Sequence, residues 1–414
     1  MKNKICIIGL GYVGLPLYIE FAKKFDVCGY DKNKNRVLQL KQGFDINNEN
    51  NIDLKSTNLN FYDNLNDIKN YNTYIVTVPT PINSNKTPDL TFIESAFSEL
   101  GVIIKKNDLV ILESTVYPGC SEEVCIPILE QKSGLKLNKD FYFGYSPERI
   151  NPGDRVNTLP KIKKVISGSN KHATNIVESL YKKIIEAGVH SVSSLKVAEA
   201  SKILENTQRD LNISLMNEFA FICDKLEINT KEVIEAASTK WNFQKFSPGL
   251  VGGHCVGVDP YYLTHKAAKV GYKPDIILSG RKVNEAVPKF IIDKIIKKIL
   301  KTGKEISNSK ILILGATFKE NCSDFRNSKI LDMYKGFKEY SLSVDIFDPL
   351  INEESYLIEN KIKLSKKLTK YDGIVLAVPH DEIIEINLKN LMKDSKTVIF
   401  DVKGVLKNPK YYQL

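Results

Sequence analysis

The sequence predicts an α/β protein in which two doubly wound domains, each with a parallel sheet, are joined by a central all-helical domain with a long helix. Three observations support this prediction. Short β-branched runs alternate with helical stretches at the start of the chain, a helical pattern without Gly or Pro covers Val197 to Asp224, and the opening pattern returns after about Gly303. A length of 414 residues, at roughly 100–200 residues per domain, fits two or three domains. We expect domains at 1–195, 196–302 and 303–414.

The strands expected in the first domain are short apolar runs that end at Gly, Asp, Pro or other polar residues. They are Lys4–Gly9, Val27–Asp31, Thr73–Pro81, Leu109–Thr115, a segment ending near Arg149 and a segment around Val165. Such runs, separated by helices, are typical of parallel strands with helices on both faces. In the central domain apolar residues recur at helical spacing, and a Gly-rich loop, Ser247–Pro260, interrupts the pattern.

Four segments of the first domain return in the last one. KILILG at Lys310–Gly315 matches KICIIG, and SVDIFDP matches VCGYDK. GIVLAVPH then matches YIVTVPTP, and TVIFDVKG matches LVILEST. A repeat of domain length indicates two copies of one α/β fold rather than a solenoid.

Composition and charge limit the class of protein. The chain is 43% hydrophobic and 26% charged, which is enough apolar material for packed cores. Its formal net charge of +10 is spread along the sequence, so it favours anionic ligands without the clustering that nucleic-acid binding needs. No uninterrupted apolar run is long enough to span a membrane. We therefore expect neither nucleic acid nor a membrane as a partner.

The cysteines indicate the compartment. Seven cysteines, an odd number without regular spacing, argue against a disulfide framework and for a reducing compartment. No cluster of Cys and His has the spacing of metal ligands, so we expect no metal site. The sequence is that expected of a cytoplasmic protein.

A glycine-rich turn directly follows the first expected strand and opens a helix. In GLGYVG, Gly9 allows the tight turn, Gly11 lets the backbone approach a pyrophosphate, and Gly14 permits close packing of helix and strand. The helix N-terminus then faces the phosphates. Asp31 ends the next strand, where a carboxylate accepts hydrogen bonds from ribose hydroxyls and repels a 2′-phosphate. This predicts a Rossmann-like domain that prefers NAD to NADP, although Arg36 lies nearby and weakens the preference.

The last domain keeps the fold pattern but loses this fingerprint. GATFKEN has one glycine at the turn, and Lys319 follows soon after it. We infer that this domain binds a different phosphate-bearing ligand, through a lysine charge rather than through bare backbone.

Cys255 is a candidate nucleophile in the Gly-rich loop, within GGHCVGVDP. Cys6 and Cys223 lie in apolar segments that are typical of buried structural cysteines, whereas the glycines around Cys255 leave room for a substrate. An ordinary thiol has a pKa near 8.5, so a helix end or a nearby cation is needed to raise the thiolate fraction. A structural role is the alternative for Cys255, and His254 beside it reads as a packing or loop residue rather than as the base.

Three polar residues share one face of the long helix. Lys202, Asn206 and Arg209 fall at i, i+4 and i+7. A buried lysine has a lowered pKa and can exchange protons, and an asparagine can hold an oxyanion or a water. The alternative is a solvated stripe in which Glu199 pairs with Lys202.

Thr115 in ESTVYPG and Glu148 in SPER both follow expected strands, where ligands bind in open α/β sheets. With GLGYVG, VPTP, the KxxxN and RD residues of Lys202–Asp210, GGHCxGxDPYY and FKEN…DxRNS, these motifs run along essentially the whole chain. In this order they resemble the UDP-glucose/GDP-mannose dehydrogenase family. That family oxidises the C6 alcohol of a nucleotide sugar to a carboxylate and uses two NAD per product.

The resemblance implies a catalytic role for individual residues. Cys255 would capture the C6 aldehyde as a thiohemiacetal, which a second NAD oxidises to a thioester that water cleaves. Lys202, helped by Asn206, would exchange protons and steady the oxyanion. Asp259 and Glu148 would handle water and proton transfer during hydrolysis.

The resemblance also implies two sets of binding residues. Those implied for NAD are Gly9, Gly11, Tyr12, Val13, Gly14, Asp31, Arg36, Thr80, Thr115 and Arg326, and Thr115 would also orient the hydrolytic water. Those implied for the nucleotide sugar are Glu148, Arg149, Ile150, Lys202, Asn206, Arg209, Gly252, Phe318, Lys319 and Lys403. Several cations among them fit a dianionic pyrophosphate.

Within the family, GGHCVGVDPYYLTHKA is most similar to the branch that acts on UDP-N-acetylhexosamines. We therefore expect oxidation of UDP-GlcNAc or UDP-GalNAc for surface polysaccharide precursors, by a homodimer formed through the central helix. UDP-glucose or UDP-ManNAc is the alternative substrate. One departure is that Thr239, Lys240 and Trp241 stand where relatives carry Arg or His donated across a dimer interface.

Two readings outside this family are more remote. A two-electron 3-hydroxyacid dehydrogenase also pairs a Rossmann domain with a helical domain, but it has no use for Cys255 or for a second α/β domain. A non-catalytic NAD-binding protein is supported only by the basic charge.

Overall fold

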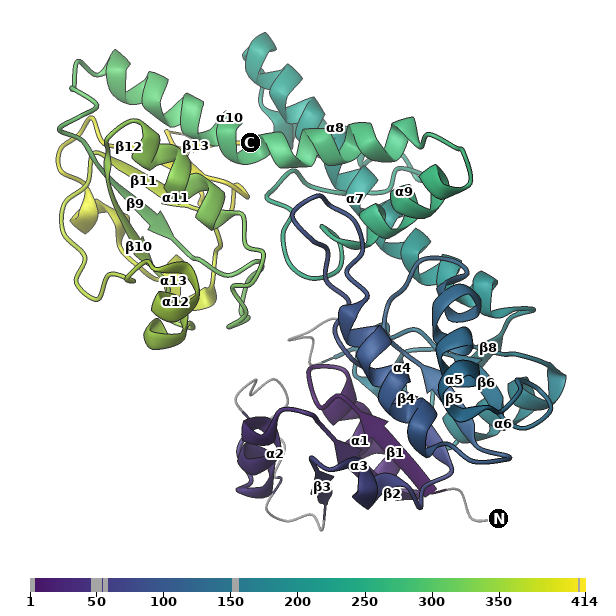
Figure 1. Ribbon diagram of the computed structural model, residues 1–414. Helices are drawn as coiled ribbons and strands as arrows, with labels where there is room; N and C mark the ends of the chain where they lie inside the picture. Colours follow the sequence, from purple (N-terminus) through teal and green to yellow (C-terminus); the bar gives the residue numbers. More distant parts are fainter. Residues whose placement is uncertain (1–3, 46–53, 55–58, 151–155, 409) are drawn as a thin grey trace. The chain divides into compact units, whose positions relative to one another are not determined.

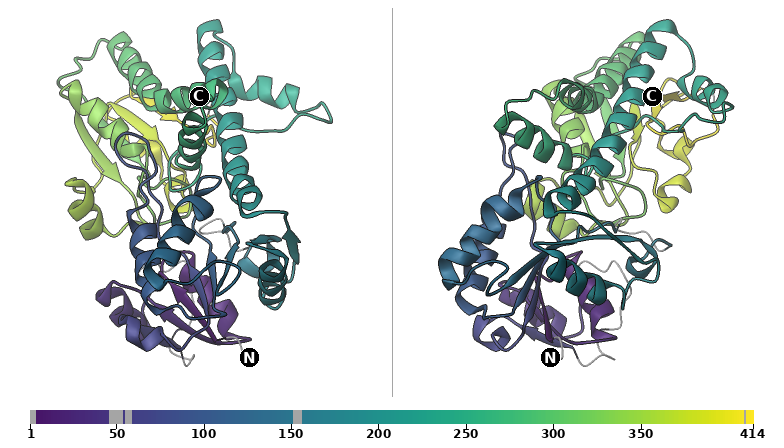
Figure 2. Two further views of the ribbon diagram at one scale, coloured as in Figure 1. Left: turned by 45° about the vertical axis from the view of Figure 1, so that its right-hand side comes forward. Right: turned by 90° about the vertical axis from the view of Figure 1, so that its right-hand side faces the viewer.

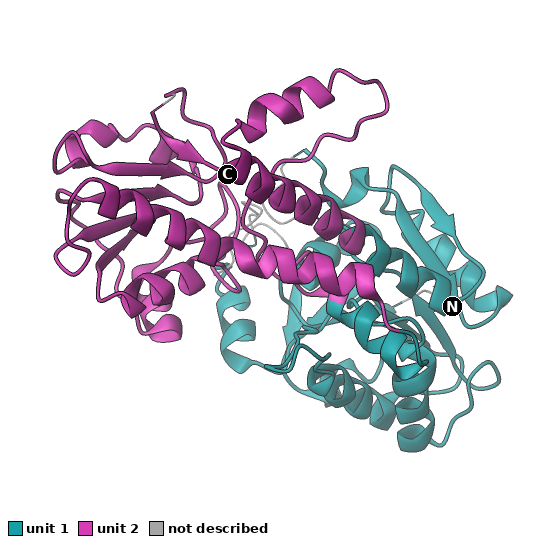
Figure 3. Ribbon diagram, turned by 90° about the horizontal axis from the view of Figure 1, so that it is seen from above, with its two compact units in different colours: residues 1–205, 261–272 teal, residues 206–260, 273–414 magenta. Residues whose placement is uncertain are grey.

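The computed structural model (Figure 1) describes residues 4–45, 54, 59–150, 156–408 and 410–414. It divides into two compact units, coloured separately in Figure 3: Met1–Glu205 with Tyr261–Tyr272, and Asn206–Pro260 with Lys273–Leu414. Each unit has its own sheet and core.

The first unit alternates strands and helices, as the sequence predicts. Its strands are β1 (Lys4–Ile8), β2 (Asp26–Tyr30), β3 (Asn60–Tyr62), β4 (Thr73–Val76), β5 (Leu109–Leu112), β6 (Tyr142–Tyr145), β7 (Lys164–Gly168) and β8 (Val189–Ser191). Its helices are α1 (Gly14–Ala22), α2 (Lys34–Lys41), α3 (Leu65–Ile68), α4 (Thr91–Ile103), the π-helix η1 (Ser121–Cys125), α5 (Ile126–Ser133), the 3-10 helix η2 (Leu159–Lys161) and α6 (Lys171–Tyr181). The expected strand Thr73–Pro81 ends at Val76, because Pro79 and Pro81 have no N–H to donate to a neighbouring strand.

The strand order of the first sheet is β3-β2-β1-β4-β5-β6-β7-β8, so the order reverses between β1 and β4. All its pairs are parallel except β6 with β7, which is antiparallel. The expectation of a parallel sheet is therefore wrong at this one pair. An antiparallel strand near the edge of a parallel sheet has the same apolar pattern, so periodicity does not reveal its direction.

Alternate residues of the first sheet face two layers of helices. Ile5 and Ile7 pack in one cluster with Tyr18 of α1 and Val177 of α6. On β6, Phe143 stacks against Phe97 of α4. Helices on both faces give the doubly wound fold that the sequence predicts.

The second unit contains helices and a smaller parallel sheet. Helix α7 (Leu195–Leu226) has 32 residues and confirms the expected long helix, and both it and α9 (Asp259–Lys269) continue from one unit into the other. The other helices are α8 (Thr230–Ala237), α10 (Asp275–Lys301), α11 (Ile330–Glu339), α12 (Glu353–Asn360), α13 (Asp381–Ile384) and the 3-10 helix η3 (Leu388–Leu391). Its strands are β9 (Lys310–Leu314), β10 (Ser343–Phe347), β11 (Gly373–Leu376), β12 (Val398–Asp401) and β13 (Tyr412–Gln413).

The second sheet has the order β10-β9-β11-β12-β13, with all its pairs parallel. Ile311 and Ile313 face a cluster that includes Ile295 of α10 and Met333 of α11, and these two helices pack side by side (Figures 1 and 2). Leu312 faces the opposite cluster. None of the described helices is both long enough and apolar enough to cross a membrane.

Candidate active site

The turn Gly9–Gly14 joins β1 to α1 in the geometry that its spacing predicts. Gly9 has a φ of +91°, and a Cβ on Gly14 would lie 1.8 Å from the carbonyl oxygen of Gly9. Both positions therefore require glycine. Among the described residues, no heavy atom beyond Gly11 and its two chain neighbours lies within 4 Å of where a Cβ on Gly11 would stand, so the backbone there is open to a ligand. Tyr12 and Val13 complete the turn, and Val13 is the N-cap of α1.

The carboxylate of Asp31 lies beside this turn. It accepts hydrogen bonds from the backbone N–H of Leu10 at 2.9 Å and of Asn33 at 2.8 Å. Arg36 is buried, donates from Nε to the Leu10 carbonyl at 2.9 Å and lies 2.7 Å from the Asp45 carboxylate. The carboxylate of Asp45 therefore offsets the charge of Arg36, the cation that a 2′-phosphate would use. The negative charge of Asp31 suits ribose hydroxyls.

Two further candidate residues follow strand ends in the first unit. The carbonyl of Thr80 accepts a hydrogen bond from the Tyr262 hydroxyl at 2.9 Å, which ties the loop after β4 to α9. Thr115 is half-buried and follows β5 by three residues. Both lie at the carboxyl edge of parallel strands, where the sequence places them.

Glu148 follows β6 and is held on both carboxylate oxygens. One oxygen accepts from the backbone N–H groups of Arg149 and Ile150 at 2.6 Å each, and the other lies 2.9 Å from Nζ of Lys164. Burial opposes ionisation of Glu148, but the charge and hydrogen bond of Lys164 outweigh it and hold the pKa of this carboxyl below its usual value. The Arg149 guanidinium forms an ion pair with Glu205 at 2.8 Å.

The three polar residues on one face of α7 differ in how much of each is exposed. Lys202 is buried, Asn206 is half-buried and Arg209 is exposed. The two carboxylate oxygens of Glu199 accept hydrogen bonds from the backbone N–H groups of Gly119 and Ser121. The alternative of a solvated stripe with Glu199 paired to Lys202 is therefore wrong, because tertiary packing covers the start of this face.

The amide of Asn206 donates to the carboxylate of Asp259, which is 2% exposed and begins α9. The loop before it carries Cys255, whose carbonyl accepts from the backbone N–H of Asp259 at 2.8 Å. All seven cysteines lie in the described part of the chain and none of them forms a disulfide, and Cys255 alone is not buried. The spacing-based prediction of an accessible thiol in this loop agrees with that exposure.

The glycines before Cys255 have a different use from the one expected. A Cβ on Gly252 would lie 2.6 Å from the carbonyl oxygen of Asn327, and one on Gly253 would lie 2.7 Å from the ring of Phe318. The backbone N–H of Gly253 donates to the Asn327 carbonyl at 3.2 Å. These glycines therefore let the cysteine loop approach the segment 318–327.

His254 fixes the same contact through its side chain. Its Nε2 lies 3.0 Å from Oδ2 of Asp324, and the guanidinium of Arg326 donates to both oxygens of Asp324 at 2.9 Å. This agrees with the interpretation of His254 as a loop residue. The expected cofactor residue Arg326 thus shares a carboxylate with the neighbour of Cys255.

Comparisons with known proteins show the family of the chain. Three domain profiles of the UDP-glucose/GDP-mannose dehydrogenase family match: the NAD binding domain at residues 3–185, the central domain at 196–286 and the UDP binding domain at 312–408. The chain belongs to this family. It is an NAD-dependent nucleotide-sugar dehydrogenase, so the readings as a 3-hydroxyacid dehydrogenase and as a non-catalytic binding protein are set aside.

Individual members of the family are similar over the whole length. The chain is 49% identical to a UDP-N-acetyl-D-glucosamine 6-dehydrogenase of Pseudomonas aeruginosa over 99% of both chains, and 49% identical to one of Salmonella typhi over 97% of this chain and 96% of that one. The solved structure of a UDP-D-ManNAc dehydrogenase from Pyrococcus horikoshii matches with a TM-score of 0.90 and 31% identity, over 99% of this chain and 98% of that one.

A pocket in the family's UDP binding domain opens at the carboxyl ends of β9 and β11, where the strand order reverses. Its lining residues are Leu250, Gly252, Thr317, Phe318, Lys319, Ser328, Lys329, Ile330, Ala377, Val378 and Lys403. Lys403 forms an ion pair with Glu320, and Nζ of Lys319 lies 5.5 Å from the centre of the Phe318 ring. These two cations and a helix start at Ile330 suit a diphosphate.

Sequence reasoning missed the rest of this lining, namely Leu250, Thr317, Ser328, Lys329, Ile330, Ala377 and Val378. The domain repeat held the signal for Val378, because AVPH after β11 corresponds to the VPTP segment after β4. The departure from the family pattern, Thr239–Trp241, follows α8, and Trp241 is 92% exposed.

Proposed function

We propose that the chain oxidises the C6 hydroxyl of UDP-N-acetyl-D-glucosamine to the uronic acid, a four-electron oxidation through a cysteine thioester. The observation that carries this proposal is Cys255: the one cysteine that is not buried lies in a loop packed against the segment that lines the UDP pocket. The names of two relatives that are 49% identical and match over nearly the full length support this sugar. The galacto epimer is the other N-acetylhexosamine that the cysteine loop sequence favours.

The residues of the chain divide the chemistry as follows. Cys255 adds to the C6 aldehyde as a thiolate, and Lys202 exchanges a proton with the sugar oxygen while Asn206 helps to hold the oxyanion. When bound, NAD accepts one hydride in each of the two oxidations. Water then cleaves the thioester and returns the free thiol. Glu148 accepts a proton in this step rather than giving one, since its pKa lies below the usual value.

The binding residues support the substrate and the cofactor. The open backbone at Gly11 and the carboxylate of Asp31 suit the pyrophosphate and ribose of NAD. Lys319 and Lys403 provide the charge for the nucleotide diphosphate, with Arg209 and Arg149 as the further cations implied by the family motifs. The product is a precursor for a surface polysaccharide, and seven cysteines without a disulfide suit synthesis in the cytoplasm.

The enzyme acts as a homodimer through α7. Leu215, Ile222 and Leu226 are 58%, 47% and 62% exposed and fall on one face of this helix at spacings of seven and four. A second copy of the chain would bury this apolar face.

An NADH-release assay over UDP-GlcNAc, UDP-GalNAc, UDP-ManNAc and UDP-glucose tests the reaction and the sugar together. We expect the largest kcat/KM for UDP-GlcNAc, with two NADH per sugar consumed. One NADH per sugar, or a preference for UDP-glucose, would contradict the proposal.

Cys255→Ser tests the covalent step. A hydroxyl is a far weaker nucleophile than a thiolate, so uronic acid formation should fall by at least about 10³-fold. NAD binding, measured by fluorescence titration, should stay unchanged. Normal acid formation by this variant would exclude the thioester route.

A further inference from the structure

Three charged side chains meet inside the first unit, and one of them is the proposed catalytic carboxylate of Glu148. Nζ of Lys164 lies 2.6 Å from Oε2 of Glu113 and 2.9 Å from Oε2 of Glu148. Lys164 is 1% exposed, Glu113 is not exposed and Glu148 is 7% exposed. An unpaired charge at such a position would cost several kcal/mol, so each member depends on the others.

The direction of β7 brings Lys164 to this place. Because β7 runs antiparallel to β6, with Tyr145 opposite Ser167, its first residue lies beside the segment that follows β6. In a parallel arrangement the same lysine would lie at the opposite edge of the sheet. The antiparallel pairing of β7 with β6 thus places the ammonium group of Lys164 at the carboxyl edge of the sheet.

The other groups that face Lys164 are neutral or acidic. The Tyr181 hydroxyl of α6 donates to Glu113, and the ring of Tyr181 lies 5.6 Å from Nζ of Lys164. Burial raises the pKa of Glu113 to about 7, although the charge of Lys164 opposes that rise. Burial lowers the pKa of Lys164, but the two carboxylates outweigh it, so the ammonium form persists.

We propose that Lys164 is a positioning residue that keeps Glu148 ionised and fixed in orientation for proton transfer during thioester hydrolysis. The proposal rests on the proposed function, which gives Glu148 that task. Lys164 is itself too buried to touch a substrate, so it acts only through the carboxylate. Glu113 is the second acceptor that makes a buried lysine tolerable here.

Lys164→Met tests this assignment through the pH profile of kcat. Without the ammonium group of Lys164, the buried Glu148 carboxyl ionises less readily and its pKa rises. The acid limb of the kcat profile should therefore move to higher pH by at least about one unit. Lys164→Arg keeps the charge and should leave the limb within a few tenths of its wild-type position. Glu113→Gln removes the other carboxylate that contacts Lys164. It should leave the acid limb at the same pH as in the wild type or at a lower pH.

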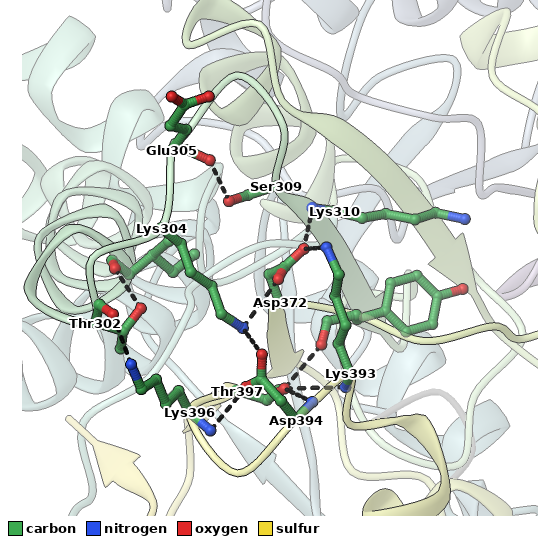
Figure 4. Close-up of polar contacts among 12 residues, drawn as sticks. Thr302, Lys304, Glu305, Ser309, Lys310, Asp372, Lys393, Asp394, Lys396 and Thr397 are labelled. Atoms are coloured by element: carbon green, nitrogen blue, oxygen red, sulfur yellow. Dashed lines mark hydrogen bonds and ion pairs between the residues drawn. The ribbon is translucent and has the colours of Figure 1, made fainter.

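Lys304→Met is the matched control. In the second unit Nζ of Lys304 lies 3.0 Å from Oδ1 of Asp372 and 2.7 Å from Oδ2 of Asp394, so this lysine also bridges two carboxylates (Figure 4). Its removal should lower the melting temperature without moving the acid limb. Loss of stability in both variants with an unmoved limb in Lys164→Met would overturn the proposal.

Two measurements separate this test from the proposed function. If the wild type releases no NADH with any UDP-sugar, the proposed function fails. The proposal on Lys164 is then judged by infrared spectroscopy at pH 7 in the Glu113→Gln background, so that a new carboxyl band cannot come from Glu113. There Lys164→Met should gain the band of a protonated carboxyl that Lys304→Met lacks, and the absence of that band contradicts the proposal. If Lys164→Met does not fold, the test is the acid limb of the kcat profile of Glu113→Gln. A shift of that limb to higher pH than in the wild type contradicts the proposal.

Discussion

One carboxylate, that of Asp324, joins two side chains with different expected tasks. His254 precedes the candidate nucleophile, and Arg326 is expected to contact NAD. Burial alone would raise the pKa of Asp324, but hydrogen bonds from His254 and Arg326 hold it far below its usual range. The carboxylate therefore stays charged at any working pH and holds both partners in place.

Asp324→Asn should separate these partners. An asparagine of the same shape keeps one acceptor oxygen but loses the charge, so we expect kcat/KM for NAD to fall at least about tenfold, while UDP affinity stays unchanged. Asp345→Asn is the control, because Asp345 also accepts from a lysine and from a hydroxyl, those of Lys310 and Tyr371. Equal losses in the two variants would show that Asp324 has only a structural role.

At the scale of elements, α7 holds the start of the cysteine loop. Asn217 is fully buried, accepts from the backbone N–H of Gly249 at 2.8 Å and donates to its carbonyl at 3.0 Å. The same amide donates to Asn284 of α10 at 2.8 Å. A loop segment is thereby fixed to two helices by one side chain, which satisfies backbone groups that have no strand partner.

Asn217→Ala removes these hydrogen bonds and leaves buried backbone groups unpaired. We expect the free energy of unfolding to fall by about 2–3 kcal/mol, as measured in urea. Cys255 should react faster with iodoacetamide, because its loop is held less firmly. Gln208→Ala, at an exposed position on α7, should change neither quantity, and an unchanged alkylation rate in Asn217→Ala would show that the loop is fixed by other contacts.

At the scale of the whole molecule, the two α/β domains repeat individual contacts. Asp31 accepts from the backbone N–H of Leu10, and Asp348 accepts in the same way from that of Ala316. In the second domain, however, the buried Nε2 of His380 lies 3.0 Å from Asp348. A side chain thus contacts the carboxylate of Asp348, and the domain that has this contact is the one without the dinucleotide fingerprint.

The proposed dimer is tested at this scale. Leu215→Lys with Ile222→Lys places two charges on the exposed apolar face of α7, so the chain should change from dimer to monomer in light scattering. Stability of the monomer should stay nearly unchanged, because both side chains are already exposed. Gln208→Lys is the control, and a wild type that runs as a monomer would contradict the proposal.

Local sequence was sufficient for much of the fold. The long helix, the strands other than β3, β8 and β13, the domain repeat and the turn at Gly9–Gly14 were predictable, because helical and strand spacing and glycine geometry depend on residues close in the chain. Positions in a Gly-rich loop, on a helix face and after a strand made Cys255, Lys202 and Glu148 candidates, and the family resemblance supplied their roles, which remain predictions.

The sequence by itself thus determined the order of elements, the NAD-type turn and the accessible cysteine of this dehydrogenase. Only the tertiary structure decided the direction of β7, the burial of Lys202, and the pairings of Lys164 with Glu148 and of His254 with Asp324. The physical reason is that these pairings join residues 16 and 70 positions apart, through a strand direction and a loop contact. Residue spacing encodes which face a side chain takes, but not which distant charge it meets there.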